Sequence, residues 1–182
     1  MTQVSADSIL EFWFREIPPK AWFQKSEAFD DEVAARFGET LDAAVRGELW
    51  AWRQTPLGRL AEVIVIDQFS RNIHRGRPES FSHDPLALVL AQSAVEQGAD
   101  LDLEPDARAF LYMPYMHSES ALIHVEAVRL FSHPGLERNL DFELRHKAVI
   151  DRFGRFPHRN AILGRASTLE EEAFLLTPGS SF

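Results

Sequence analysis

PLGRLAEVIVIDQF, the sequence from Pro56 to Phe69, is apolar over almost the whole surface of the helix that its spacing predicts. Thr55 is a good helix cap, and Pro56 follows it at the first helical position, where proline is favoured. Leu60, Ile64 and their neighbours form one apolar face, and Val63 and Ile66 widen it. A helix that is apolar almost all round is normally buried, so we predict that this stretch lies at the centre of the fold.

Helical periodicity continues on both sides of this stretch. Further helices are predicted to start at Ser5 or Asp7, near Glu27, at Asp84-Pro85, at Glu104-Pro105, at Ser118, near Leu136 and at Ser167-Thr168. Stops or interruptions are predicted at Pro18-Pro19, Gly38, Leu49, Gly98, Pro114 and Phe153. No segment alternates with a period of two, and no linker divides the chain. We therefore predict an all-α fold of antiparallel helices in a single compact domain, residues 1–182.

The composition excludes several classes of protein. The 182 residues carry a formal net charge of -9, which argues against a general nucleic-acid or anionic-membrane binder because a polyanion would be repelled. The absence of cysteine excludes disulfides, thiolate metal sites and a cysteine nucleophile, and it fits a reducing compartment. No leader segment and no membrane-spanning run is visible. We expect a soluble cytoplasmic protein, and the sequence predicts no oligomeric state.

Two polar strings, Asp67–Arg77 and Arg152–Asn160, place Arg, His and Asn between large apolar residues where predicted helices end. Guanidinium groups offer planar forked donors that suit a carboxylate or phosphate, so a small anionic molecule is the expected partner. Asp67 and Arg71 are one helical turn apart and are expected to pair. The predicted ligand-binding residues are Asp67, Arg71, Asn72, Arg75, Arg155, His158, Arg159 and Asn160. The alternative is structural: such residues also cap helix ends and pack by their stems.

His117, Ser118 and Glu119 form a second group of interest. A histidine beside a carboxylate at a helix start suits general acid or base chemistry near neutral pH, which makes His117 and Glu119 the candidate catalytic residues. Ser118 is interpreted as a helix cap because the glycine-flanked elbow of hydrolases is missing. The alternative is a capped helix with a hydrogen-bonded histidine. His146 lies on an apolar stripe and is interpreted as a core histidine, or as one that faces Asp67.

Metal and nucleotide chemistry has little support in the sequence. The seven histidines show no His-Glu-x-x-His pattern and no compact ligand spacing, so no metal site is predicted. The chain also lacks a glycine-rich phosphate loop and a dinucleotide fingerprint. No cofactor is expected.

Five strings carry a resemblance to a known family. They are Ile9–Phe14, Asp67–Asn72, Phe81–Leu88, Met116–Glu119 and Arg152–Asn160. Together they resemble the bacterial domain-of-unknown-function 924 family over essentially the full chain. Ser70 departs from the family pattern, where proline is expected, and Ser120 stands where an acidic residue is expected. The resemblance implies a tetratricopeptide-like right-handed αα-superhelix, although no tetratricopeptide consensus is present in the chain.

Two functions of different classes follow. In the first, the Arg, His and Asn residues line a pocket for a small anionic molecule, and the protein is an enzyme that uses His117 or Glu119 for proton transfer. In the second, a groove of the tetratricopeptide-like fold binds a protein or peptide, and the arginines clamp a peptide carboxylate. The second interpretation rests on analogy of fold alone.

Overall fold

The computed structural model describes residues 4–181, and every regular element in that range is helical. The α-helices are α1 (Ala6–Glu11), α2 (Glu27–Val45), α3 (Pro56–Ile64), α4 (Ser70–Ile73), α5 (Asp84–Glu96), α6 (Pro105–Met116), α7 (Ala121–Phe131), α8 (Glu137–Phe153) and α9 (Leu169–Leu175). Two π-helical segments, Phe12–Glu16 and Val65–Phe69, extend α1 and α3. Short 3₁₀ turns lie at Pro19–Phe23, Trp50–Gln54, Pro78–Ser80, Ala99–Asp102 and Pro157–Arg159. The all-α prediction is confirmed.

Helix α3 and the π-helical segment that follows it lie at the centre, as predicted. Thr55 caps α3 by accepting a hydrogen bond from the Gly58 amide, and Pro56 occupies the first turn. Helices α1, α5 and α6 pack on α3, and α2 packs on the π-helical segment. All five side chains of Val65–Phe69 are buried. Neighbouring helices cover this helix on several sides. This explains why its side chains are apolar over almost the whole helix surface.

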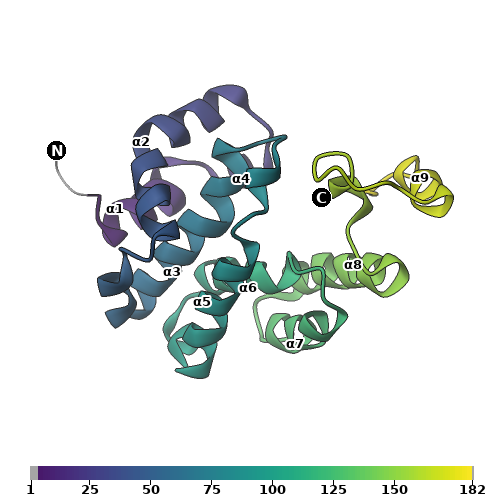
Figure 1. The fold of residues 1–182 in the computed structure, drawn as a ribbon. Helices are drawn as coiled ribbons and strands as arrows, with labels where there is room; N and C mark the ends of the chain where they lie inside the picture. Colours follow the sequence, from purple (N-terminus) through teal and green to yellow (C-terminus); the bar gives the residue numbers. More distant parts are fainter. Residues whose placement is uncertain (1–3, 182) are drawn as a thin grey trace.

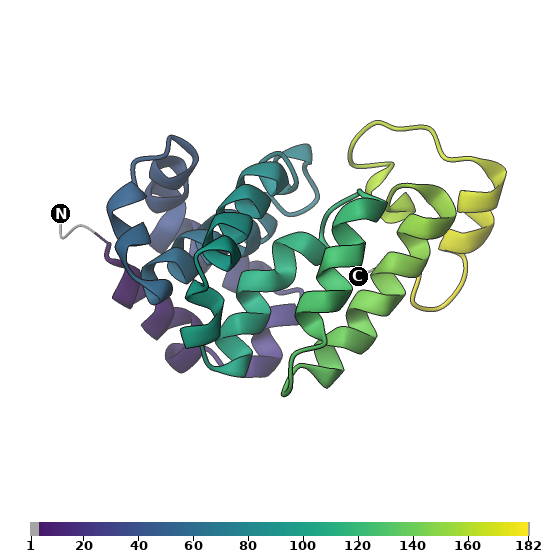
Figure 2. The ribbon, with the colours of Figure 1, turned by 90° about the horizontal axis from the view of Figure 1, so that it is seen from below.

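The remaining helices follow one another in space in the order of the chain (Figures 1 and 2). Helix α5 packs on α6, α6 on α7, and α7 on α8, while α9 lies against the Pro157–Arg159 turn. The main apolar core extends from α1 to the start of α8. A smaller apolar cluster joins the end of α8 to α9, with Phe156 fully buried at its centre. The described residues therefore form one all-helical domain; its limits at residues 1 and 182 stay predictions.

Several predicted helix limits differ from the structure. Helix α2 runs through Gly38 without a break and ends at Val45, four residues before the predicted Leu49. Helix α6 contains Pro114 and continues to Met116. Helix α7 begins after Ser120 and not at Ser118. The physical reason is that the Ser118 carbonyl accepts a hydrogen bond from the His124 side chain of α7, and the Glu119 side chain accepts one from the distant Phe156 amide, so this part of the chain does not continue as a regular helix.

Within residues 4–181, no helix combines the length and the apolar character that a crossing of the bilayer requires.

Candidate functional site

The centre of the candidate site is Asp67, which lies in the π-helical segment at the end of α3. Such π-helical turns are rare and occur frequently at functional sites. The Asp67 carboxylate is 1% exposed, and it accepts a hydrogen bond of 2.5 Å from Gln68 Nε2. Arg71 Nη1 lies 3.1 Å from Asp67 Oδ1, which confirms the pair predicted from their spacing. Burial acts to raise the pKa of Asp67, but Arg71 and His117 outweigh it and hold that pKa well below its usual range.

His117, at the C-terminal end of α6, is the second member of the site. Its Nδ1 lies 2.8 Å from Asp67 Oδ1. Since an ionised carboxylate only accepts, Nδ1 carries the hydrogen, and Nε2 of the neutral ring is the basic nitrogen. Burial and then Arg71 lower the pKa of His117, although Asp67 acts in the opposite direction. The imidazole is therefore neutral at pH 7 and held in one tautomer.

Asp84, the first residue of α5, joins two arginines that are distant in the sequence. Arg71 Nη1 lies 2.9 Å from Asp84 Oδ1, and Arg159 Nη1 lies 3.1 Å from Asp84 Oδ2. From sequence, Asp84 was interpreted only as the start of a helix, so this functional candidate was missed. The available signals were the Asp-Pro pair and its place in the Phe81–Leu88 string that carries the family resemblance, and neither pointed to Arg159.

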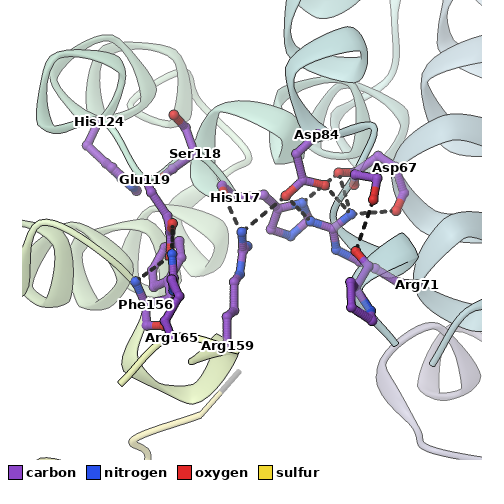
Figure 3. A network of polar contacts seen from close by, with 12 residues as sticks. Asp67, Arg71, Asp84, His117, Ser118, Glu119, His124, Phe156, Arg159 and Arg165 are labelled. Carbon is purple, nitrogen blue, oxygen red and sulfur yellow. Dashed lines mark hydrogen bonds and ion pairs between the residues drawn. The ribbon is translucent and has the colours of Figure 1, made fainter. Parts of the chain in front are cut away.

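Arg159 comes from the 3₁₀ turn before the C-terminal segment and lies at the same place (Figure 3). Its Nη2 donates a hydrogen bond of 3.0 Å to the His117 carbonyl, while Phe81 and Phe156 lie on the guanidinium at 4.5 and 4.7 Å. Within the described part of the chain, its buried Nε has no hydrogen-bond acceptor. Burial, and secondarily the nearby Arg71, lower the pKa of Arg159 to about 10. The charge of this guanidinium is thus poorly compensated.

Glu119 lies close to His117 in the sequence but has different partners. Its Oε1 accepts a hydrogen bond of 2.7 Å from the Phe156 amide, and its Oε2 lies 2.6 Å from Arg165 Nη1. Burial acts to raise the pKa of Glu119, but the Arg165 and Phe156 donors lower it overall. Glu119 therefore anchors the C-terminal segment to the loop before α7. Arg165 was not predicted as a site residue.

A hollow of about 330 Å³ opens between these groups. Its polar lining consists of Ser82, Asp84, His117, Ser118, Glu119 and Arg159. Its apolar lining consists of Pro78, Phe81, Pro85, Leu88, Pro114 and Leu163. No side chain or backbone group of residues 4–181 hydrogen-bonds to Nε2 of His117. The hollow thus combines an imidazole, an arginine and an apolar wall.

The other predicted ligand residues lie elsewhere. Asn72 and Arg75 both bind Asp30 of α2, beside a second hollow that His117 does not line. Arg155 and Asn160 both bind Glu171 of α9. The structure therefore divides the eight predicted ligand residues between three places.

Two further histidines stabilise the segments around the site. His158 lies against the Phe156 ring at 5.6 Å, and burial with the neighbouring Arg159 lowers its pKa to about 4. His146 donates a hydrogen bond from Nδ1 to the Phe142 carbonyl, and burial lowers its pKa to about 3. Its ring meets the Phe156 ring edge-on at 5.7 Å. This placement agrees with the interpretation of His146 as a core histidine.

The comparisons with other proteins establish the family. The chain matches a family described as bacterial protein of unknown function, DUF924, over residues 9–179. The chain belongs to the DUF924 family. It is similar to a solved structure of a protein of unknown function from Agrobacterium tumefaciens, with 37% sequence identity and a TM-score of 0.89 over 94% of this chain and 96% of that chain. No functionally curated protein matches this DUF924 chain.

The charges around the hollow of this DUF924 protein balance one another. Three carboxylates, of Asp67, Asp84 and Glu119, face three guanidinium groups, of Arg71, Arg159 and Arg165. With His117 neutral, this cluster of seven side chains has no net formal charge. Residues 4–181 contain no group of three or more His, Asp or Glu side chains placed to hold a metal ion. What the arrangement offers chemically is therefore an oriented base beside a desolvated arginine.

Proposed function

We propose that the hollow binds a small anionic molecule and that His117 acts on it as a general base, so that the protein is an enzyme. The observation that carries this proposal is the 2.8 Å hydrogen bond from His117 Nδ1 to the buried Asp67 carboxylate, which leaves Nε2 as the basic nitrogen, without a hydrogen-bond partner among residues 4–181. His117 also lines the hollow next to Arg159. A base oriented by a carboxylate is a recurring device for proton transfer in enzymes.

The protonation state of His117 supports this role. A general base must be unprotonated at the working pH, and burial with the charge of Arg71 lowers the pKa of His117. Asp67 fixes the ring by accepting the Nδ1 hydrogen, so rotation of the imidazole would break a buried hydrogen bond. His117 is therefore pre-organised to accept a proton at Nε2 from a bound molecule or from water.

The remaining predicted site residues receive supporting roles in this proposal. Arg159 is the ligand-binding residue, Asp67 and Arg71 position His117, and Glu119 holds the loop before α7 through Arg165 and the Phe156 amide. The other predicted residues have structural roles away from the hollow: Asn72 and Arg75 bind Asp30, Arg155 and Asn160 bind Glu171, and His158 lies against Phe156. The cytoplasmic location and the tetratricopeptide-like superhelix remain part of this proposal, the latter supported by the packing of consecutive helices from α5 to α8.

The test begins with thermal stability against a panel of carboxylates, phosphates, nucleotides and amino acids, because a ligand that prefers the native state raises the melting temperature with its concentration. We expect one anion class to raise it. Compounds that do so are then incubated with the protein in D₂O and followed by NMR for hydrolysis or for exchange of carbon-bound hydrogens. We expect one of these reactions with the native protein.

The decisive variant is His117→Asn, because the asparagine Nδ2 replaces the Nδ1 donor to Asp67 and removes Nε2. We expect it to keep the melting temperature and ligand binding but to lose turnover. Arg152→Gln is the matched control, since Arg152 pairs with Glu170 at the surface and does not line the hollow. Full turnover in His117→Asn would contradict the role of the base. The absence of any shift across the panel would contradict the pocket, and peptide partners would then be tested.

A further inference from the structure

We propose that the occupant of the hollow is a small monocarboxylate with an apolar body, and that His117 takes up one proton when this ligand binds. The inference rests on the proposed function, because it concerns the same hollow: the complex with a protonated His117 corresponds to the state after the base has accepted its proton. It adds the chemical class of the ligand and a proton count. Both follow from the charge balance and from the lining of the hollow.

The charge balance limits the ligand to one negative charge. Arg165 is bound to both oxygens of Glu119, and Arg71 lies between Asp67 and Asp84. Arg159 is the exception in the cluster, because it shares Asp84 with Arg71 and has a buried Nε without an acceptor. A phosphate or a dicarboxylate would bring two charges into a neutral, partly buried cluster, and such charges are costly without partners. One carboxylate beside Arg159 brings only one.

Proton uptake by His117 restores neutrality when that carboxylate enters. The groups around His117 are Asp67 from the π-helical segment, Arg71 from α4, Asp84 from α5, Arg159 from the turn after α8, and Glu119 with its partner Arg165. His146 and His158 add minor repulsion. The carboxylates of Asp67 and Glu119 do not take the extra proton readily, because neighbouring donors lower the pKa of each. The Nε2 nitrogen of His117 has no partner within residues 4–181, and an imidazolium there would donate to the ligand carboxylate.

The apolar lining determines the rest of the ligand. Half of the residues around the hollow are prolines, leucine or phenylalanine, including Phe81, Leu88 and Leu163. Their side chains neither donate nor accept hydrogen bonds. A volume of about 330 Å³ is at the lower end of the range of small-molecule pockets. A short alkyl chain or a single aromatic ring satisfies both the size and the chemistry.

The experiment is isothermal titration calorimetry at pH 7.5 on the full chain with acetate, butyrate, hexanoate and benzoate. Benzamide, succinate and inorganic phosphate are the comparison compounds. Each titration is repeated in buffers of different ionisation enthalpy, since the slope of the observed enthalpy gives the number of protons taken up. We expect affinity to rise from acetate to hexanoate, benzoate to bind at least tenfold more tightly than benzamide, and one proton to be taken up by each carboxylate. In His117→Asn we expect no proton uptake, with Arg152→Gln as the control that behaves like the native protein.

Different failures are distinguishable. Tighter binding of phosphate or succinate than of hexanoate would overturn the monocarboxylate class while it leaves an anion site in place. Carboxylate binding without proton uptake, or equal uptake in His117→Asn, would overturn the role of His117 in charge balance. Equal binding of benzamide and benzoate, or no binding of any compound, would overturn the proposed function as well.

Discussion

Asp67 and His117 are fifty residues apart in the sequence, yet Oδ1 of the aspartate lies 2.8 Å from Nδ1 of the histidine. The same oxygen lies 3.1 Å from Arg71, so one buried carboxylate connects the central helix to the end of α6. Asp67 therefore has two roles: it compensates a buried guanidinium, and it fixes the tautomer of the proposed base. Removal of its charge must affect both the stability of the fold and the protonation of His117.

Asp67→Asn is expected to lower the free energy of unfolding by about 3 kcal/mol, because breaking a buried ion pair leaves an uncompensated charge. It is also expected to lower the pKa of His117 further, since the Asp67 charge favours the imidazolium. Urea denaturation measures the first effect, and NMR titration of the His117 ring measures the second. Asp141→Asn is the control, because the Asp141–Arg145 pair is exposed at the surface and is expected to contribute below about 1 kcal/mol. Equal effects of the two substitutions would contradict the structural role of Asp67.

Local features of the site were predictable from sequence. Residues four apart on a helix face each other, so the Asp67–Arg71 pair followed directly from spacing. The buried centre from Pro56 to Phe69 followed from its apolar character all round. In both cases the deciding sequence pattern lies within one continuous helical stretch.

Contacts between distant helices were not predictable in the same way. The sequence grouped His117 with its neighbour Glu119 as candidate catalytic residues and named no distant partner, whereas His117 is bonded to Asp67 because α6 ends beside the π-helical turn after α3. Arg75 and Arg155 were grouped with Arg159 by composition, although their side chains bind Asp30 and Glu171 in other parts of the fold. One sequence shows which residues are polar and which helix face they occupy. It does not show which helices meet.

Acid is expected to destabilise the protein below about pH 6.5. Burial lowers the pKa of His146 to about 3 and that of His158 to about 4, and the pKa of His117 is also lowered. Each of these histidines is neutral in the folded chain but protonated below about pH 6.5 in the unfolded chain, so the unfolded state binds more protons as pH falls. Each contributes a loss of about 1.4 kcal/mol per pH unit in that window.

Urea denaturation at pH 7.5, 6.5, 5.5 and 4.5 measures this loss. The raised pKa of Glu143 acts in the opposite direction, because the folded state keeps a proton there that the unfolded state releases above its ordinary pKa. The histidines outnumber it, so the net slope is a loss on acidification. His146→Gln should flatten the curve. A free energy of unfolding that stays constant or rises from pH 6.5 to 4.5 would contradict the assignment of these histidines as neutral.

Two glycines in helices are expected to respond in opposite ways to alanine. A Cβ atom at Gly58 would lie 1.9 Å from the Trp52 carbonyl oxygen, so Gly58→Ala must displace backbone and is expected to cost about 2 kcal/mol or more. A Cβ atom at Gly38 would meet nothing within 4 Å, and Gly38→Ala is expected to stabilise α2 by about 0.5 to 1 kcal/mol. Thermal and urea denaturation of both variants measures the contrast. A stabilised Gly58→Ala protein would show that the chain before α3 packs differently.

His124 and Glu143 form a buried hydrogen-bonded pair, and the contacts of His124 show that one proton lies between the two side chains. Its Nε2 lies 2.8 Å from the Ser118 carbonyl, which only accepts, so Nε2 carries a hydrogen. Its Nδ1 lies 2.7 Å from Glu143 Oε1, and one further proton must lie between them. Both side chains are fully buried, and burial raises the pKa of Glu143. The buried Oε2 of Glu143 receives no hydrogen bond from residues 4–181. An unpaired buried oxygen costs less free energy on a neutral carboxylic acid than on a charged carboxylate. We therefore predict that the proton is on Glu143.

Glu143→Gln tests this assignment because the glutamine amide donates to Nδ1 as a protonated glutamic acid does. We expect a loss of less than about 1 kcal/mol in the free energy of unfolding for Glu143→Gln. For Glu143→Ala we expect a loss of about 3 kcal/mol, from a cavity and an unpaired Nδ1. Glu126→Gln, in the exposed pair with Arg129 on α7, controls for the loss of one carboxylate. If the proton were on His124, the glutamine would leave a buried imidazolium without a counter-charge, and Glu143→Gln would be as damaging as Glu143→Ala. Urea denaturation of the three variants at pH 7 distinguishes the two cases, since only a neutral His124 allows the two substitutions at position 143 to differ.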